Sequence, residues 1–499
     1  MKSKKFLNWA FIALLCGAVT ACNNDDDNND GVDDGKDQGS SSLVFDGNVI
    51  GNGDQEFVFS GKETLTQGTY LLKGWVYIAD GAELTIEPGT IIKGDKQTKA
   101  ALIVEPGGKL YAQGTADKPI VFTSEEAKGN RRPGDWGGII ICGNARNNQG
   151  QMQIEGGPRT KHGGSNDADN SGIISYVRVE FAGYPFERDK EINGVTFGSV
   201  GNGTQVDHVQ VSYCNDDSYE WFGGTVNAKY LVAYKGWDDE FDTDNGFSGK
   251  VQFCLSVRDS RIADTSQSNG FESDNCADGA AIDPYTTATF SNITFIGPKA
   301  VDANFENTTD YINGGEVYPN NGSALGRFQA AMQIRRNSRL NCFNSIAIGY
   351  PIGLILDNQK GDTQSAATNG LLKLQNIWFA DMDVTGSDAN KSYDDVLVTG
   401  YDGDGKPIYD NTQTSFSSRF FLAQSGNKVS TLDEMNLSGA ETSVGTNYRP
   451  AAGSPLLSAA SFTDGKLASM QQVSYIGAFD ANDNWIDGWT EFDPQNADY

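Results

Sequence analysis

The sequence predicts an all-β solenoid, a fold in which short strands wind into stacked coils. Glycine supports this: the 499-residue chain has 59 glycines and 14 prolines, which suits many short strands joined by tight turns. Two motifs also recur. Glu87-Pro88-Gly89 returns as Glu105-Pro106-Gly107, and the pair Asp216-Asp217 returns as Asp238-Asp239. Both intervals lie within the roughly 18 to 24 residues that are typical of a β-solenoid repeat, because single coils bury their apolar faces only by stacking.

The first 21 residues have the pattern of a cleaved leader. Lys2, Lys4 and Lys5 precede a mostly apolar run from Phe6 to Leu15, and Val19-Thr20-Ala21-Cys22 follows. The apolar run is shorter than the roughly 20 residues of a membrane span. Val-Thr-Ala-Cys resembles a bacterial lipobox, and the resemblance implies that Cys22 becomes the lipidated first residue of the mature protein.

Residues 22–44 are expected to form a disordered, acidic tether. Beyond the cysteine they are mainly Asp, Asn, Gly and Ser, which cannot bury a core. The run Asn23-Asn24-Asp25-Asp26-Asp27 resembles the acidic export signal of surface lipoproteins in the Bacteroidetes. This resemblance implies a protein held in the outer membrane by its lipid anchor and exposed on the cell surface.

Charge and cysteine content exclude several classes of function. A formal net charge of −28 repels phosphate backbones, so nucleic acid is not an expected partner. Five cysteines remain after the leader and Cys22, and their odd number and wide spacing favour buried thiols over disulfides or a zinc site. They are Cys142, Cys214, Cys254, Cys276 and Cys342.

The strands of the solenoid are expected between residues 45 and 430. Short runs such as "GIISYVRVEFAG", "VDHVQVSYC" and "KVQFCLSVRD" are rich in β-branched and aromatic residues, and Gly, Asn or Asp clusters separate them. Residues 431–499, including "NYRPAAGSPLLSAASF", are expected to form a closing coil and a cap that folds over the end of the stack. An antiparallel sandwich also uses many short strands, but it does not require near-copies at a fixed period.

Several longer phrases resemble a Bacteroidetes family of surface lipoproteins with a right-handed parallel β-helix body. They include "LTIEPGTIIKG", "ALIVEPGGKLYAQGTADKPIVFTS", "PGDWGGIIICGNA" and "WFGGTVNAKY", and the resemblance extends from about Leu65 to Gln495. It implies the fold and the location on the cell surface. It implies no settled activity.

The repeated acidic pairs are the main candidate site. In stacked coils, like positions lie about 4.8 Å apart, so carboxylates one period apart repel each other and need compensation. One interpretation is a Ca²⁺ site, because Ca²⁺ takes six to eight oxygen ligands. The candidate ligands are Asp216, Asp217, Glu220, Asp238, Asp239, Asp242 and Asp244. A second interpretation is structural: the acids lie in solvated turns, neutralised by Arg258, Arg261, Arg335 or Arg336.

The third interpretation is catalytic, with two carboxylates cutting a glycosidic bond as acid and base. Trp221 and Trp237 beside the acidic pairs, with Glu272 in the next coil, are candidates for binding a sugar. The sequence thus favours a binding or scaffolding module for carbohydrate or another extracellular polymer, stabilised by Ca²⁺ and associated with an outer-membrane uptake receptor. The alternative is a polysaccharide lyase or glycoside hydrolase on the same fold.

Overall fold

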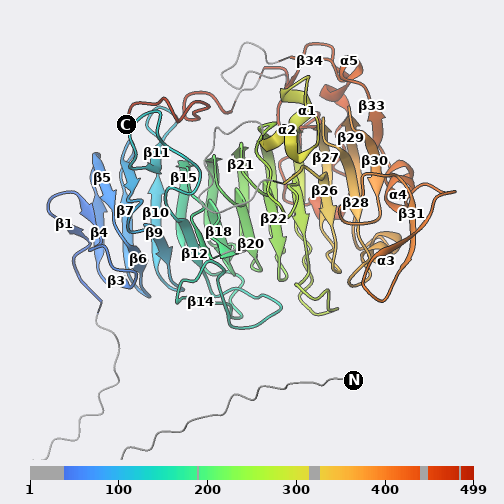
Figure 1. The fold of residues 1–499 in the computed structure, drawn as a ribbon. Coiled ribbons are helices and arrows are strands. Elements are labelled where there is room, and N and C mark those ends of the chain that lie inside the picture. The colour runs from blue at the N-terminus through green and yellow to red at the C-terminus, as the bar shows by residue number, and fades with distance from the viewer. Residues whose placement is uncertain (1–38, 188–189, 314–325, 439–447, 483–484) are drawn as a thin grey trace, which may run out of the picture. The chain divides into compact units, whose positions relative to one another are not determined.

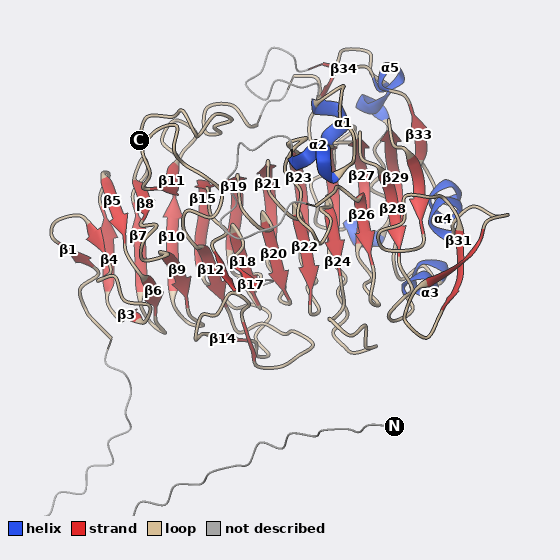
Figure 2. Cartoon of the chain, viewed as in Figure 1, coloured by secondary structure: helices blue, strands red, loops and turns tan. Residues whose placement is uncertain are grey.

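The computed structural model describes residues 39–187, 190–313, 326–438, 448–482 and 485–499. The described chain winds into stacked coils, and strands make up far more of it than helices (Figures 1 and 2). Two long sheets run along the stack, and nearly all of their strand pairs are parallel. The predicted all-β parallel β-helix is therefore confirmed.

Sheet A, as we call the 11-stranded sheet, carries the acidic residues. In stacking order its strands are β3 (Phe57–Phe59), β6 (Trp75–Ile78), β9 (Ala101–Val104), β12 (Gly138–Cys142), β18 (Val195–Gly198), β20 (Tyr219–Phe222), β22 (Phe241–Asp244), β24 (Phe271–Ser273), β26 (Ala330–Ile334), β28 (Ile352–Leu356) and β30 (Val384–Ser387). Side chains alternate between the two faces of a strand. On β22, Phe241 and Thr243 are buried, whereas Asp242 and Asp244 are partly exposed.

Sheet B has 16 strands in the described chain. They are β1 (Val44–Phe45), β2 (Val49–Ile50), β4 (Lys62–Leu65), β5 (Thr69–Leu72), β7 (Glu83–Ile86), β8 (Ile91–Gly94), β10 (Lys109–Gln113), β11 (Ile120–Ser124), β15 (Gly172–Glu180), β19 (Gln205–Ser212), β21 (Asn227–Tyr234), β23 (Lys250–Val257), β25 (Thr289–Ile296), β27 (Asn341–Ile348), β29 (Leu374–Ala380) and β33 (Lys428–Ser430). The short strands β10 and β11 both pair with β15. Later coils therefore use one long, bent strand where early coils use two.

The bend in these long strands lies at one register position, which we call the corner ladder. Its members all have positive φ, and they are Tyr176, His208, Tyr230, Phe253, Asn292, Asn344 and Asn376. The rings of Tyr176 and His208 stack with centroids 4.2 Å apart, and those of His208 and Tyr230 with centroids 4.5 Å apart. Farther along, Asn376 Nδ2 donates to Asn344 Oδ1 at 2.7 Å.

The two Glu-Pro-Gly motifs do form turns, but they are not one coil apart. Glu87-Pro88-Gly89 joins β7 to β8 within sheet B, whereas Glu105-Pro106-Gly107 joins β9 of sheet A to β10 of sheet B. The coil in this region runs from Tyr77 to its register partner Ile103, which is a longer interval than the one between the motifs. The period read from these motifs was wrong, because each coil has several corners that require the same turn chemistry. The interval between the acidic pairs is a true coil, since Glu220 pairs with Asp242.

The inside of the stack is one continuous apolar core. It contains the inward-facing residues of both sheets, including stacked aromatic rings such as Trp221 on Phe247 at 5.3 Å. The five predicted thiols, Cys142, Cys214, Cys254, Cys276 and Cys342, are all free and buried. This agrees with their expected role as small apolar residues.

Helices and small hairpins decorate the corners of the coils (Figure 2). The helices are α1 (Pro298–Val301), α2 (Thr309–Asn313), α3 (Thr363–Thr368), α4 (Phe416–Ala423) and α5 (Leu432–Met435), with 3₁₀ turns at Pro455–Ser458 and Gly465–Leu467. The hairpins pair β13 (Met152–Gln153) with β14 (Lys161–His162), β16 (Pro185–Glu187) with β17 (Lys190–Glu191), β31 (Leu397–Tyr401) with β32 (Pro407–Asp410), and β34 (Leu437–Ser438) with β35 (Arg449–Pro450). None of the helices in the described residues combines the length and apolar character that a bilayer span requires.

The C-terminal strap, residues 448–482 and 485–499, runs back along the stack, so the chain ends beside the early coils (Figure 1). Its backbone accepts hydrogen bonds from Asn344 at Ser461, from Asn292 at Tyr475 and from Gln210 at Glu491. Lys93 of β8 donates to the backbone oxygen of Tyr499 at 3.0 Å. The sequence predicts instead that this segment covers the end of the stack.

Helix α4 covers that end instead. The ring of Phe421 stacks on Phe379 of β29 with centroids 4.1 Å apart, and Phe420 is also buried in the core. Between β15 and β29 the strap instead follows the corner ladder, where the amides of Asn292, Asn344 and Asn376 donate to its backbone oxygens. The rings of His208 and Tyr230 contact Trp489 and Trp485 of the strap.

Candidate functional site

Three carboxylates lie in register on the outer face of sheet A. Glu220 of β20 pairs with Asp242 of β22, which pairs with Glu272 of β24. Thr196 precedes them in the same column and Gln333 follows. We call Glu220, Asp242 and Glu272 the acidic column. Its alignment is the one expected from the repeat of the acidic pairs.

Asp217 and Asp239 have a different task in the turn before these strands. Asp217 Oδ1 accepts the backbone N–H of Asp239 at 2.8 Å, and Asp239 Oδ1 accepts the backbone N–H of Asn269 in the next coil. Each carboxylate thus ties its own coil to the following one. Their geometry explains the repeated acidic pair in part as a structural staple.

Asp216 and Asp238 precede these staples in the two turns and are partly exposed. Asp238 Oδ2 accepts a hydrogen bond from Ser266 Oγ at 2.6 Å. Asp216, Asp217 and Asp238 each offer a carboxylate oxygen, and these oxygens lie within 4.8 Å of one another. The turns therefore bring together acids that the sequence analysis proposed as one ligand set.

Arginines neutralise one end of the column. Arg335 Nε donates to Asp274 at 2.9 Å, and Arg335 also contacts Glu272. Arg336 Nη1 lies 2.5 Å from Asp274. Burial alone would lower the pKa of Arg335, but the charges of Asp274 and Glu272 outweigh it and hold that pKa well above its usual range. Arg335 and Arg336, which the structural interpretation named, thus neutralise Glu272 and Asp274, but Glu272 lies on strand β24 and not in a solvated turn.

A buried ion pair supports the turn that carries Asp238 and Asp239. Arg258 Nη1 lies 2.5 Å from Glu240 Oε1, and both side chains are fully buried. Arg258 also donates to the backbone oxygens of Trp237 and Asp238. Arg258 was expected at a solvated turn. Its contacts show that it fixes the turn from inside the stack.

The other end of the column has no such partner in the part of the chain that the structure describes. Asp217, Glu220 and Asp242 each offer a carboxylate oxygen, and these oxygens lie within 4.8 Å of one another. Asp242 Oδ1 is buried and has no hydrogen-bond partner among the described residues. An acceptor in that position is costly to leave unpaired.

Burial and like charges raise the pKa of these carboxyl groups. Burial, with the nearby charges of Glu155 and Asp216, raises the pKa of Glu220 well above its usual range. Burial and the charge of Glu220 do the same for the pKa of Asp242. Burial and the charge of Asp274 raise the pKa of Asp244 to about 7. At neutral pH this end of the column holds protons or requires a cation.

The carboxylates fit a Ca²⁺ ion. Ca²⁺ binds oxygens at about 2.3–2.6 Å, so two ligands on opposite sides of one ion are about 4.6–5.2 Å apart. The carboxylate oxygens of Asp217, Glu220 and Asp242 all lie within 4.8 Å of one another, which agrees with that limit. Once their protons are released, carboxylates are also the hard, anionic donors that Ca²⁺ prefers.

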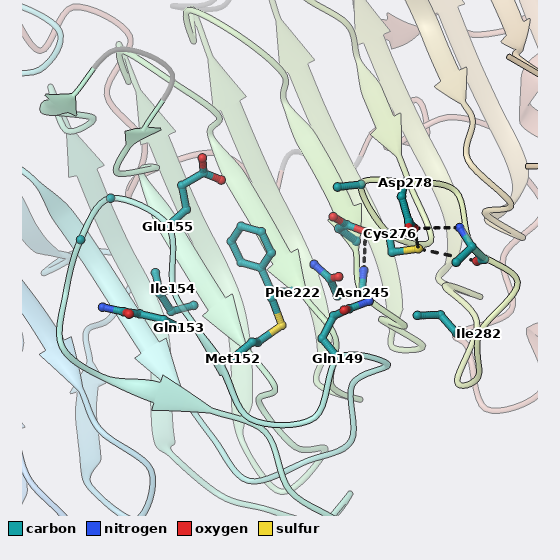
Figure 3. Close-up of a pocket in the computed structure, with 15 residues that line it drawn as sticks. Gln149, Met152, Gln153, Ile154, Glu155, Phe222, Asn245, Cys276, Asp278 and Ile282 are labelled. Carbon is teal, nitrogen blue, oxygen red and sulfur yellow. Dashed lines mark hydrogen bonds between the residues drawn. The ribbon is translucent and has the colours of Figure 1, made fainter. Parts of the chain in front are cut away.

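A cavity of about 980 Å³ adjoins the acidic column (Figure 3). Asp244, which follows Asp242 on the same face of β22, lines it. The loop that holds β13 and β14 forms one wall, and the turn after β24 forms another. Phe222 and Asn245 line its floor, and Cys276 lies on the far wall beside Asp278 (Figure 3). A polar rim around one aromatic floor residue is a common pattern in small-molecule sites.

The structure corrects the aromatic ligand residues. Trp221 and Trp237 were expected to flank a sugar, but their exposed fractions are 0% and 1% and both pack in apolar clusters. On β20, Tyr219 and Trp221 face the core, so Glu220 and Phe222 face outward. Phe222 is therefore the aromatic residue of the cavity.

Sequence reasoning missed the loop residues of this cavity, such as Met152 and Glu155. They lie far ahead of Glu220 in the sequence and outside the repeated motifs. Only the stacking of coils brings their loop beside β20 and β22.

Residues 58–418 match the family model of the pectate-lyase like beta helix domain. The chain belongs to this family. Comparisons with curated proteins and with solved structures give no match. The pectate-lyase-like match covers most of both sheets and includes every member of the acidic column.

Proposed function

We propose that the protein is an extracellular binding module, in which the acidic column holds Ca²⁺ and the adjoining cavity receives a unit of a carbohydrate or another extracellular polymer. The observation that carries this proposal is the group formed by Asp217, Glu220 and Asp242. Their oxygens are close enough to share one ion, and Asp242 has a buried oxygen that lacks a hydrogen-bond partner among the described residues.

In this function Asp217, Glu220 and Asp242 hold the ion, and Asp244 connects the ion site to the cavity. The bound ion supplies positive charge that the described residues lack at this end of the column. Arg335 and Arg336 keep Glu272 and Asp274 neutralised at the other end. Phe222 offers a ring, and Asn245 and Gln149 offer amides, to a ligand rich in hydroxyl groups.

A calcium titration tests the ion site. We expect the wild type to bind Ca²⁺ in calorimetry and to melt at a higher temperature with Ca²⁺ than with a chelator, because the ion binds the folded state. The double change Glu220→Gln with Asp242→Asn removes two anionic ligands with little change of shape and should abolish both effects. The exposed Asp46→Asn is the matched control and should leave them unchanged. A wild type whose melting temperature ignores Ca²⁺ contradicts the ion site.

Glycan binding is tested separately. We expect a glycan array to give signals for the wild type that weaken when Phe222→Ala removes the ring from the cavity floor. Phe421→Ala, which changes a buried Phe of helix α4 outside this cavity, controls for general loss of packing. Glycan signals that survive Phe222→Ala would place the polymer elsewhere.

One observation favours the alternative of a glycoside hydrolase. Glu220 and Asp242 have raised pKa values and lie close together, so one can hold a proton while the other is ionised. Retaining glycosidases use two carboxyl groups roughly 5–5.5 Å apart. A lyase finds less support, because the high pKa of Arg335 makes it a poor base. A polysaccharide-digestion screen distinguishes the hydrolase from the binding module. Hydrolysis products that the wild type forms and Glu220→Gln does not would establish a hydrolase. A wild type that digests no polysaccharide would contradict the hydrolase.

The cellular location is proposed from the N-terminal leader. Cys22 is inferred to be lipidated, anchoring the protein in the outer membrane with the β-helix on the cell surface, where it can associate with an uptake receptor. Residues 1–38, with Cys22 and most of the tether, lie outside the described residues. Cys22→Ala should release the protein from membranes. Resistance of the wild type to external protease in intact cells would contradict surface exposure.

A further inference from the structure

A second cavity, of about 550 Å³, lies on sheet B beside the C-terminal strap. Outward side chains of β19, β21 and β23 form its floor in two rows. One row is Gln205, Asn227 and Lys250, and the other is Asp207, Lys229 and Gln252. Ser469 and Met470 of the strap form a wall. None of these residues belongs to the acidic column or to the cavity beside it.

Several polar groups of this floor are already engaged. Asp207 accepts hydrogen bonds from Ser175 at 2.6 Å, from Gln205 at 2.8 Å and from the ring of His208 at 2.8 Å. Gln252 donates to the backbone oxygen of Gln471 and accepts from its N–H. These bonds hold the floor and the strap in place, so the cavity has a fixed shape before any ligand arrives.

Lys229 is the exception. It is half-buried on β21, and it makes no hydrogen bond or ion pair within the described ranges. Its register neighbour Asp207 does not pair with it, because Asp207 is turned to its own three donors.

The side-chain amide N–H₂ of Asn227 lies in the next row. Its oxygen accepts the backbone N–H of Lys250 at 2.9 Å, which directs the carbonyl side of the amide to the sheet. The oxygen of Gln205 is the third polar group of the floor that has no bonding partner in the described part of the chain. The cavity therefore offers a cation, an amide donor and an amide acceptor, on strands about 4.8 Å apart and in two rows about 6.6 Å apart.

We propose that this cavity binds an acidic saccharide, with the sugar carboxylate on Lys229 and its hydroxyl groups on Asn227 and Gln205. A sugar carboxylate supplies the negative partner that the ammonium group of Lys229 lacks, and charge-assisted hydrogen bonds are stronger than neutral ones. Amides both donate and accept, as hydroxyl groups do, so they suit a sugar better than they suit a bare anion. A volume of about 550 Å³ is within the range of small-ligand pockets.

The experiment compares methyl glucuronide with methyl glucoside on the full chain, by calorimetry with a chelator present. The two probes differ in the carboxylate, and the chelator separates this site from the calcium proposal. We expect the glucuronide to bind on the order of tenfold more tightly, because one charge-assisted bond is at stake. Lys229→Gln should remove that preference. Lys62→Gln, an exposed lysine of β4, should keep it.

A second variant and a competition locate the sugar. Asn227→Ala should weaken both probes while leaving their ratio near tenfold, because it removes a hydroxyl contact and not the charge. Acetate and sulfate should compete only at much higher concentration than the glucuronide. Equal binding of the two probes, a preference that survives Lys229→Gln, or competition by acetate as effective as that by the glucuronide would each overturn the proposal.

Discussion

The acidic column on sheet A and the corner ladder on sheet B use the same stacked coils but reach electrostatic balance in different ways. In the corner ladder, rings stack at 4.2 Å and 4.5 Å, and asparagine amides donate to the next asparagine or to the strap. In the acidic column, like charges face one another across the same spacing. Two unit charges about 4.8 Å apart repel by about 0.9 kcal/mol in water and by about 3.5 kcal/mol at an effective dielectric constant of about 20.

Because the coils stack in register, the attraction or repulsion between like side chains is repeated along each column. Rings and amides attract their copies, so the corner ladder is satisfied by its own members and by the strap that covers it. Carboxylates repel their copies, so the acidic column is balanced only by groups outside the repeat. Arg335 and Arg336 supply that balance at one end, and we propose that Ca²⁺ supplies it at the other.

The largest loss of stability should come from removing Arg335, the arginine that neutralises one end of the acidic column. Arg335→Gln leaves Glu272 and Asp274 without their main partner in a site where Arg335 is 14% exposed. Breaking such a pair costs about 3–5 kcal/mol, since it strands a buried charge. We expect urea unfolding of Arg335→Gln to show a loss in the free energy of unfolding near the lower end of this range. The double change Arg335→Gln with Glu272→Gln should recover part of it, and a double variant no more stable than the single one would contradict this account.

The corner ladder should lose less stability when one rung is removed. Asn344 has a φ of 51° and bonds Asn376 of the ladder, Ser291 of β25 and Ser461 of the strap. Asn344→Ala loses these hydrogen bonds and places alanine in the left-handed region, at a cost of about 2–3 kcal/mol. Hydrogen exchange in the strap should rise with it. Asn344→Gly should recover the backbone part of the loss, and equal losses for alanine and glycine would argue against strain.

Neutralising one carboxylate of the acidic column should raise the free energy of unfolding in the absence of metal and lower it in the presence of Ca²⁺. With chelator present, Asp242 must either repel Glu220 and Glu272 or take up a proton, and Asp242→Asn removes both costs, so the free energy of unfolding should rise by about 1–2 kcal/mol. With Ca²⁺ present, the same change should lower it relative to wild type. A variant less stable than wild type in both conditions would show that Asp242 is bonded internally.

The smallest effect should be a pH dependence of the metal-free protein. The pKa of Asp244 is raised to about 7, so the folded state holds a proton that the unfolded state has already released. Stability should therefore fall as pH rises, by about 1 kcal/mol between about pH 6 and pH 8. Asp244→Asn should flatten this slope in chemical denaturation. A wild-type stability that rises over this range would contradict the raised pKa.

The sequence was sufficient for the fold class and for the acidic column. Tandem strands with β-branched residues and polar turns predict a solenoid, because the pattern is local and repeats. The segment from Glu220 to Asp242 forms one coil without insertions, so sequence spacing translated directly into register. The same reasoning failed for Glu-Pro-Gly, since turns at different corners share one chemistry.

The sequence by itself determined that this protein is a parallel stack of coils with carboxylates aligned on one face. Only the tertiary structure decided that Trp221 faces the core while Phe222 faces the cavity, because a shift of one residue reverses the face of a strand. It also decided that the strap returns along the corner ladder and that Lys229 lies in a cavity beside it. Those contacts join residues hundreds of positions apart, and no local pattern encodes such a pairing.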